Sequence, residues 1–221
     1  MDVADRTIRV RLVKDEEHFS EVLMGWALTA KVSLWISTAN LKELHIPAPI
    51  GSRARAKGAY VSVLETLTSL VRSGVELRIL HGGIPSRPFR AELTKQKELN
   101  VPGKVLRMCP RLHMKLVVAD GGRAYVGSAN FTGAGFGAKG AGRRNFELGV
   151  VTDDPNFLDE TQARFDRIWS GKECGNCSLR RVCPEPIDLL IEKRKARKAR
   201  ANAPTAVPRA KARTSLRPTE R

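Results

Sequence analysis

The sequence predicts an α/β domain in which a mixed β-sheet lies between helices, followed by a basic, disordered C-terminal tail. Short apolar or alternating runs, typical of strands, are interleaved with segments that have apolar residues at helical spacing. The 221 residues are 42% hydrophobic, enough for one sizeable core. We expect a main domain at 1–172, a cysteine-containing segment with a short helix at 173–191, and the tail at 192–221.

The elements of the first half follow from their periodicity and their end signals. Gly74 ends one helical pattern, and residues 101–103 (Val-Pro-Gly) read as a turn. We expect strands at 7–13, 31–37, 75–80 and 104–108, and helices at 15–30, 59–73 and 87–99.

A predicted hairpin follows. Leu116 to Ala119 form an apolar run, preceded by alternation from Leu112, so the segment reads as a buried strand. His113 and Lys115 are two residues apart and therefore point the same way. Residues 120–122 (Asp-Gly-Gly) supply a turn, and 123–127 return as a second strand.

This hairpin brings Ser128 and Asn130 back toward His113. An imidazole can attack phosphorus or protonate a leaving oxygen, and the ammonium of Lys115 neutralises developing charge. A hydroxyl and an amide beside them suit a phosphate oxyanion. The segment therefore predicts a site that cleaves phosphodiesters.

The same residues resemble a known family. The HxKxxxxDxxxxxxGSxN motif of the phospholipase D superfamily is matched at every fixed position by His113, Lys115, Asp120, Gly127, Ser128 and Asn130. Glu147 resembles the acidic residue that many members carry on the following strand. The motif with Glu147 covers 113–147, and the general strand and helix pattern extends the likeness over about 20–170.

The motif occurs once. Residues 37–40 (Ser-Thr-Ala-Asn) echo 127–130 (Gly-Ser-Ala-Asn), but no HxK precedes them. The chain is therefore similar to the short, single-motif members, whose site is completed by a second copy of the same chain. This resemblance implies a homodimer with a phospholipase D-like fold.

The resemblance also implies a mechanism without a catalytic cofactor. His113 of one protomer would form a phosphohistidine, and His113 of the other would protonate the leaving oxygen. Lys115 and Asn130 would hold the non-bridging oxygens, with Ser128 bonding nearby and Glu147 orienting a histidine. Asp120 belongs to the motif but is expected to support the turn.

We expect a metal-independent phosphodiesterase, an endonuclease on DNA or RNA. One alternative is a phospholipase D or phospholipid transferase, since the chemistry is the same for any phosphodiester. The other is a nucleic-acid-binding module with a dormant site, against which the intact motif argues.

A glycine-rich segment at 132–144 follows the motif. It predicts a flap in which Arg143 and Arg144 attract polyanions, or else a disordered surface insertion. A strand at 147–152 and a helix at 155–169, ended by Gly171, complete the main domain.

Positive charge is concentrated at the C-terminus. The net charge is +16, and residues 193–221 hold eleven lysines and arginines against one acid. A helix expected at 186–200 runs into this region. We expect nucleic-acid contacts there, with a solvated tail or peripheral membrane contact as alternatives. The candidate residues are Lys193, Arg194, Lys195, Arg197, Lys198 and Arg200.

Three cysteines lie close together at Cys174, Cys177 and Cys183, and Cys109 lies upstream. This pattern predicts thiolate ligands for a structural [4Fe-4S] cluster or a zinc ion, with ordinary reduced cysteines as the alternative. The spacing resembles the iron-sulfur staple of some bacterial helicase-nucleases. The N-terminus has no signal-peptide pattern, so we expect a cytoplasmic protein.

Overall fold

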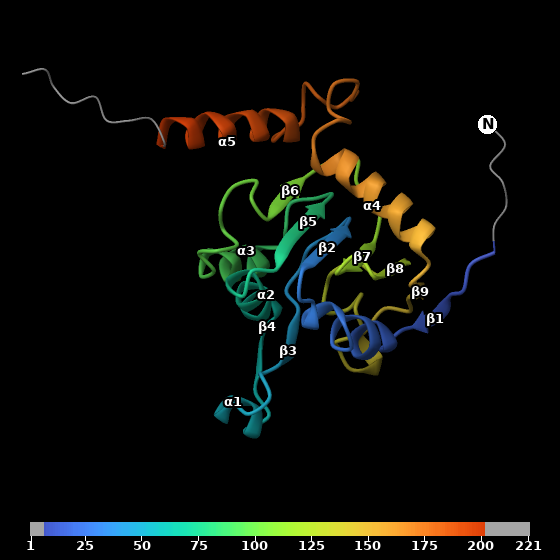
Figure 1. The fold of residues 1–221 in the computed structure, drawn as a ribbon. Coiled ribbons are helices and arrows are strands. Elements are labelled where there is room, and N and C mark those ends of the chain that lie inside the picture. Colours follow the sequence, from blue (N-terminus) through green and yellow to red (C-terminus); the bar gives the residue numbers. More distant parts are fainter. Residues whose placement is uncertain (1–6, 202–221) are drawn as a thin grey trace, which may run out of the picture.

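The computed structural model describes residues 7–201 and has a seven-stranded sheet at its centre (Figure 1). The strand order is β1-β9-β8-β7-β2-β5-β6. The strands are β1 (Arg11–Lys14), β2 (Ser33–Thr38), β5 (Glu76–His81), β6 (Leu106–Met108), β7 (Leu116–Ala119), β8 (Arg123–Gly127) and β9 (Leu148–Thr152). Strands β2, β5 and β6 are parallel, whereas the pairings from β1 through to β2 are antiparallel. The predicted mixed sheet is confirmed.

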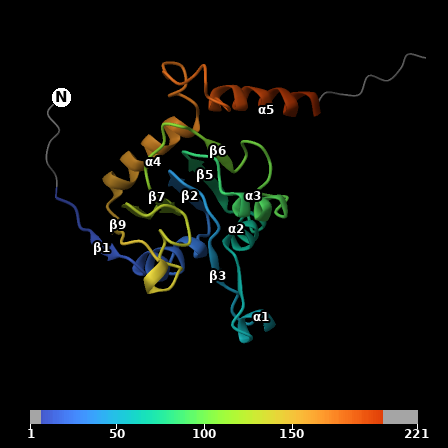
Figure 2. The same ribbon diagram turned by 180° about the vertical axis from the view of Figure 1, so that it is seen from behind.

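Helices cover both faces of this sheet (Figures 1 and 2). One apolar core lies between the sheet and η1, η2, α2 and α3, and the other lies against α4 and the start of α5. A small hairpin, β3 (His45–Pro47) with β4 (Tyr60–Ser62), projects away and carries α1 (Arg53–Ala56). The other helices are η1 (His18–Leu23), η2 (Ala27–Thr29), α2 (Val63–Arg72), α3 (Arg87–Thr94), η3 (Ala141–Arg143), α4 (Pro155–Trp169) and α5 (Ile187–Ala201).

Alternation along the strands supplies both cores. On β2, Leu34 and Ile36 are buried in the first core, while Trp35 points to the second. Trp35 stacks on Phe165 of α4 at 5.2 Å between ring centroids. Helix α4 has the predicted bounds because Asp154 caps its first turn and Gly171 follows its end with a positive φ.

Some elements differ from their prediction. The helix expected at 15–30 is divided into a π-helix and a 3₁₀ helix. The helix expected at 59–73 begins only at Val63 because Tyr60–Ser62 pairs as β4, and the one expected at 87–99 ends at Thr94. Helix α5 continues through Ala201, so the expected domain boundary at 192 falls inside it. Residues 202–221 of the expected tail lie outside the described residues.

Asp120 lies in the β7–β8 turn and has the supporting contacts there that were expected of it. It has a φ of 54°, and its carboxylate accepts hydrogen bonds from the backbone N–H groups of residues 31–33, at 2.7–3.0 Å. Burial would raise the pKa of Asp120, but these hydrogen bonds outweigh it and the pKa is lowered. Asp120 therefore ties the end of β7 to the start of β2.

Replacing Asp120 with alanine should lower the free energy of unfolding by about 1–2 kcal/mol, because three backbone donors lose a charged acceptor at an exposed turn. Urea unfolding followed by circular dichroism measures this. Asp159→Ala is the control, since the Asp159 side chain is exposed and has no hydrogen bond or ion pair among residues 7–201. Equal stabilities of the two variants would contradict the structural role.

Two histidines are buried away from solvent. His18 lies under Tyr125, with ring centroids 5.2 Å apart, and its Nδ1 lies 2.9 Å from the Asp15 carbonyl. His81 Nδ1 lies 2.9 Å from the Gly83 carbonyl. Burial lowers the pKa of each ring, and the backbone hydrogen bonds only partly oppose this.

Because both histidine pKa values are lowered, the unfolded chain binds protons that the folded chain does not as the pH falls below about 6.5. The free energy of unfolding should therefore fall between pH 7 and pH 5. Urea midpoints at several pH values should show this slope, and a shallower one for His81→Gln. Exposed His45→Gln is the control, and a flat wild-type profile would refute the expectation.

Candidate active site

His113 and Lys115 lie just before β7, in an extended segment that the pairing of β7 holds in place. The strand begins at Leu116, later than predicted, and hydrogen-bonds to β2 on one side and β8 on the other. Lys115 Nζ lies 3.1 and 3.2 Å from the two ring nitrogens of His113, and it donates to the His113 carbonyl at 2.8 Å. His113 is exposed, so this imidazole and ammonium are presented together to solvent.

Ser128 and Glu147 form a second pair where β8 ends and β9 begins. The Ser128 hydroxyl donates to Glu147 Oε2, and it accepts from the Leu148 N–H at 3.1 Å. Glu147 Oε1 accepts from Asn145 at 2.9 Å. The hydrogen bonds of this carboxylate within residues 7–201 thus go to Ser128 and Asn145, and its expected role toward a histidine remains a prediction.

Asn130 is oriented by the end of β2. Its Oδ1 lies 3.2 Å from the Thr38 hydroxyl and accepts from the Asn40 N–H at 3.1 Å. Its amino group is therefore the end that can donate to a phosphate oxygen. Thr38 also accepts from the Phe131 N–H at 2.9 Å, which fixes the chain after β8. Thr38 was not among the residues predicted for the site, although residues 37–40 lie at the carboxyl end of a predicted strand.

The electrostatics favour an anionic ligand. Burial lowers the pKa of Lys115, and Glu147 partly opposes this. The ammonium form of Lys115 can supply charge and hydrogen bonds to a phosphoryl oxygen beside a nucleophilic or acidic imidazole. No second histidine lines either of the two cavities that His113 lines within the described part of the chain.

Several cavities surround these residues. One of about 330 Å³ is lined by His113, Lys115, Thr161 and Arg164, and another of about 160 Å³ by His113, Arg111 and Arg164. Asn130 lines a third of about 270 Å³ with Lys42 and Lys139. Arg164, Arg111 and Lys42 had no signal in the sequence, because they come from segments that only the fold brings to the site.

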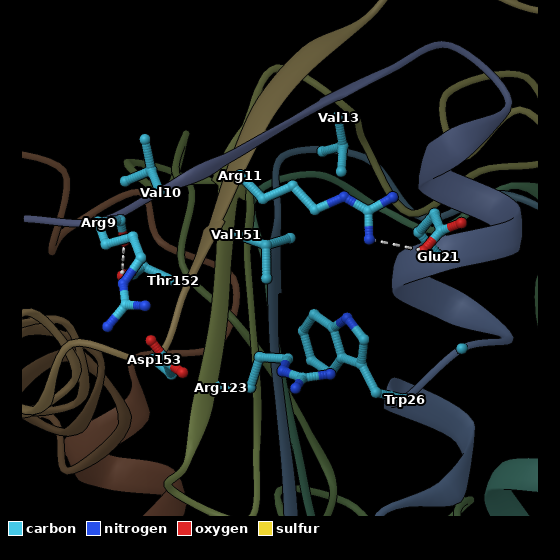
Figure 3. A pocket seen from close by; sticks show the side chains of 11 residues that line it. Arg9, Val10, Arg11, Val13, Glu21, Trp26, Arg123, Val151, Thr152 and Asp153 are labelled. Atoms are coloured by element: carbon cyan, nitrogen blue, oxygen red, sulfur yellow. Dashed lines mark hydrogen bonds and ion pairs between the residues drawn. The ribbon is translucent and has the colours of Figure 1, made fainter.

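A cavity larger than these three lies elsewhere, at the opposite ends of β8 and β9 (Figure 3). It measures about 360 Å³ and is lined by Arg9, Arg11, Trp26 and Arg123. Arg11 pairs with Glu21 at 3.0 Å across its rim, as Figure 3 shows. No motif residue lines it, so its size does not make it the active site.

Some predicted nucleic-acid residues have structural partners. Arg144 pairs with Glu16 at 2.9 Å, and Arg194 donates to the Gly103 carbonyl, which docks α5 against the loop before β6. Both side chains thus already have a partner, and their contacts with nucleic acid remain a prediction. Arg143, Lys193, Lys195 and Arg197 are exposed, whereas the side chains of Lys198 and Arg200 lie outside the described part. None of the described helices is long and apolar enough to cross a membrane.

All four cysteines line one cavity, between the loop after β6 and the segment joining α4 to α5. Their thiols are free, and burial raises the pKa of Cys109. However, within residues 7–201 no three His, Cys, Asp or Glu side chains are placed to hold a metal ion. The zinc or [4Fe-4S] site predicted at Cys109, Cys174, Cys177 and Cys183 is therefore not supported.

Comparison with known proteins identifies relatives of this chain by family and by sequence. The family model described as cardiolipin synthase, PLD-like domain, matches residues 28–169. Cardiolipin synthase A of Pseudomonas aeruginosa is 36% identical over 112 residues, which are 48% of this chain and 21% of that protein. The chain thus aligns with about a fifth of the length of this relative.

A solved structure shows the same fold. The phospholipase D family member Nuc from Salmonella typhimurium superposes with a TM-score of 0.50 and 19% identity, over 74% of this chain and 95% of that one. NucT from Helicobacter pylori superposes with a TM-score of 0.48 and 13% identity, over 73% of this chain and 95% of that one. With the family match over more than half of its length, the chain belongs to the phospholipase D superfamily.

Proposed function

We propose that this protein is a metal-independent phosphodiesterase that cleaves DNA or RNA internally. The observation that carries the proposal is the pair formed by exposed His113 and half-buried Lys115, with Lys115 Nζ 3.1 Å from a ring nitrogen of His113. A histidine nucleophile beside a fixed cation provides both covalent catalysis and charge stabilisation at phosphorus.

The reaction proceeds in two displacements. His113 of one protomer attacks phosphorus, the bond from phosphorus to the leaving oxygen breaks, and the partner's His113 gives that oxygen a proton. Water then attacks the phosphohistidine and passes a proton to the partner's histidine, which restores both rings. Lys115 and the amino group of Asn130 hold the non-bridging oxygens in both steps.

The basic composition favours a nucleic-acid substrate. The net charge is +16, and Lys193, Lys195 and Arg197 are exposed on α5. Such cations bind phosphate backbones with release of counterions. A phospholipid substrate is the second candidate, because the matching family model and the relative in Pseudomonas aeruginosa are both described as cardiolipin synthases.

A second copy of the chain completes the site in this proposal. At the β1–β9 edge of the sheet, Leu12 is 53% exposed, Leu148 55% and Phe146 95%. Leu12 and Leu148 lie on the same face of the sheet as α4, but α4 packs farther along the sheet and leaves them uncovered. Phe146 precedes Glu147 in the chain. An exposed apolar edge beside a site with one histidine fits an isologous interface. No structural metal forms part of the proposal.

Cleavage should survive chelation, because histidine and lysine supply what other nucleases take from magnesium. Turnover of single-stranded DNA, duplex DNA, RNA and phosphatidylglycerol vesicles is measured with EDTA and with magnesium. We expect polynucleotide turnover with EDTA within about twofold of that with magnesium, and a loss of about 10³-fold or more in His113→Ala. Strict magnesium dependence would refute the mechanism, and turnover of the vesicles alone would establish the second candidate.

Mixing protomers tests the composite site. Wild-type and His113→Ala chains are co-expressed with different tags, and activity is measured against the wild-type fraction. If each site needs both histidines, heterodimers are inactive and activity falls as the square of that fraction. A linear fall would mean that each protomer works alone.

Leu148→Lys should convert the dimer to a monomer, as measured by size-exclusion chromatography. Lys57→Ala, at an exposed position near α1, should leave the dimer unchanged.

A further inference from the structure

Arg164 is an unassigned cation beside the active site. It lies on α4, and it lines both cavities that His113 lines. Arg111 lines the smaller one. The sheet and α4 thus form a hollow in which two guanidinium groups accompany His113 and Lys115.

Glu173 holds Arg164 in place without cancelling the charge of the hollow. Glu173 Oε1 accepts from Arg164 at 3.0 Å and from Arg167 at 2.9 Å. One carboxylate shared by two arginines leaves a net positive charge. The pKa of Glu173 is lowered, chiefly by the hydrogen bond from Arg167 and also by the positive charge of Arg164. Arg111 adds a further charge, since it has no side-chain partner within residues 7–201.

The other flank of the site is also cationic. Lys42 and Lys139 line the cavity of Asn130, where Glu43 is the one acidic residue that lines it among the described residues. Cations therefore lie beyond His113 on the α4 flank and beyond Asn130 on the other. A single phosphodiester needs the central residues alone, whereas a chain of phosphodiesters has further anionic groups that reach both flanks.

We propose that Arg164, with Arg111 beside it, binds a substrate phosphate that neighbours the one attacked by His113, so that this flank selects polynucleotides over substrates with one phosphate. The inference rests on the proposed phosphodiesterase activity. Guanidinium suits this role because its planar fork binds phosphate through two parallel hydrogen bonds. The neighbouring phosphate would displace Glu173 from Arg164.

The test compares two substrates of the same enzyme. One is a single-stranded oligonucleotide, and the other is bis(4-nitrophenyl) phosphate, which has no neighbouring phosphate. The measured quantity is the ratio of kcat/KM for the first to kcat/KM for the second. Arg164→Ala should lower this ratio about tenfold, mainly through KM for the oligonucleotide. Glu173→Gln, which releases Arg164, should raise it.

Arg167→Ala is the matched control. Arg167 lies one turn from Arg164, pairs with the same carboxylate oxygen and is 58% exposed against 53% for Arg164, but it lines neither cavity. Its ratio should equal the wild-type value. An unchanged ratio in Arg164→Ala, or an equal fall in Arg167→Ala, would overturn the phosphate site. Thermal unfolding of each variant excludes a folding defect.

The outcomes separate this inference from the proposed function. An enzyme that cleaves both substrates, with the same ratio in Arg164→Ala as in the wild type, would refute the neighbouring-phosphate site while leaving a phosphodiesterase. An enzyme that cleaves neither would refute the proposed function and the inference with it. A lowered ratio in Arg164→Ala alone would support both.

Discussion

The pairing of β7 on both sides is the constraint on which the site depends. Leu116 lies opposite Val126 on β8 and Ser37 on β2, so the residues just before β7 meet the ends of both neighbours. Because side chains alternate along a strand, a shift of one residue would exchange the residues of β7 between the two cores, one of which holds Leu116 and Val118 and the other Val117 and Ala119. The packing of both cores therefore fixes the register, and this register places the Lys115 carbonyl 3.3 Å from the Gly127 N–H.

Charge in this protein divides between structural contacts and sites open to a ligand. Arg144 is engaged by Glu16 and Arg194 by a backbone carbonyl, and neither has the freedom that a count of charges suggests. Lys115, by contrast, has a histidine and a carbonyl as its hydrogen-bonding neighbours, and no carboxylate forms an ion pair with it within residues 7–201. Net charge thus indicates the class of ligand, while the pairing of each cation decides where that ligand binds.

The features that could be predicted from the sequence are those that depend on residues close together in the chain. The hairpin of β7 and β8 has a turn of three residues, so its register and the approach of Lys115 to Gly127 follow from spacing. Helix α4 has its predicted bounds because a cap, a proline and a glycine mark its ends. The hydrogen bond from Thr38 to Asn130 and the position of Arg164 beside His113 bring together residues that are far apart in the chain. Local periodicity does not encode such contacts.

The segment between α4 and α5 links two features that are separate in sequence. Glu173 follows α4 directly and lines the hollow of His113, while its neighbour Cys174 lines the cavity that all four cysteines share. Cys109 and Arg111 line both cavities, and they lie only a few residues before His113. The packing of the cysteine segment therefore sets the position of Glu173, and through Glu173 it sets that of Arg164. A segment without helix or strand thus has a direct physical connection to the substrate flank of the site.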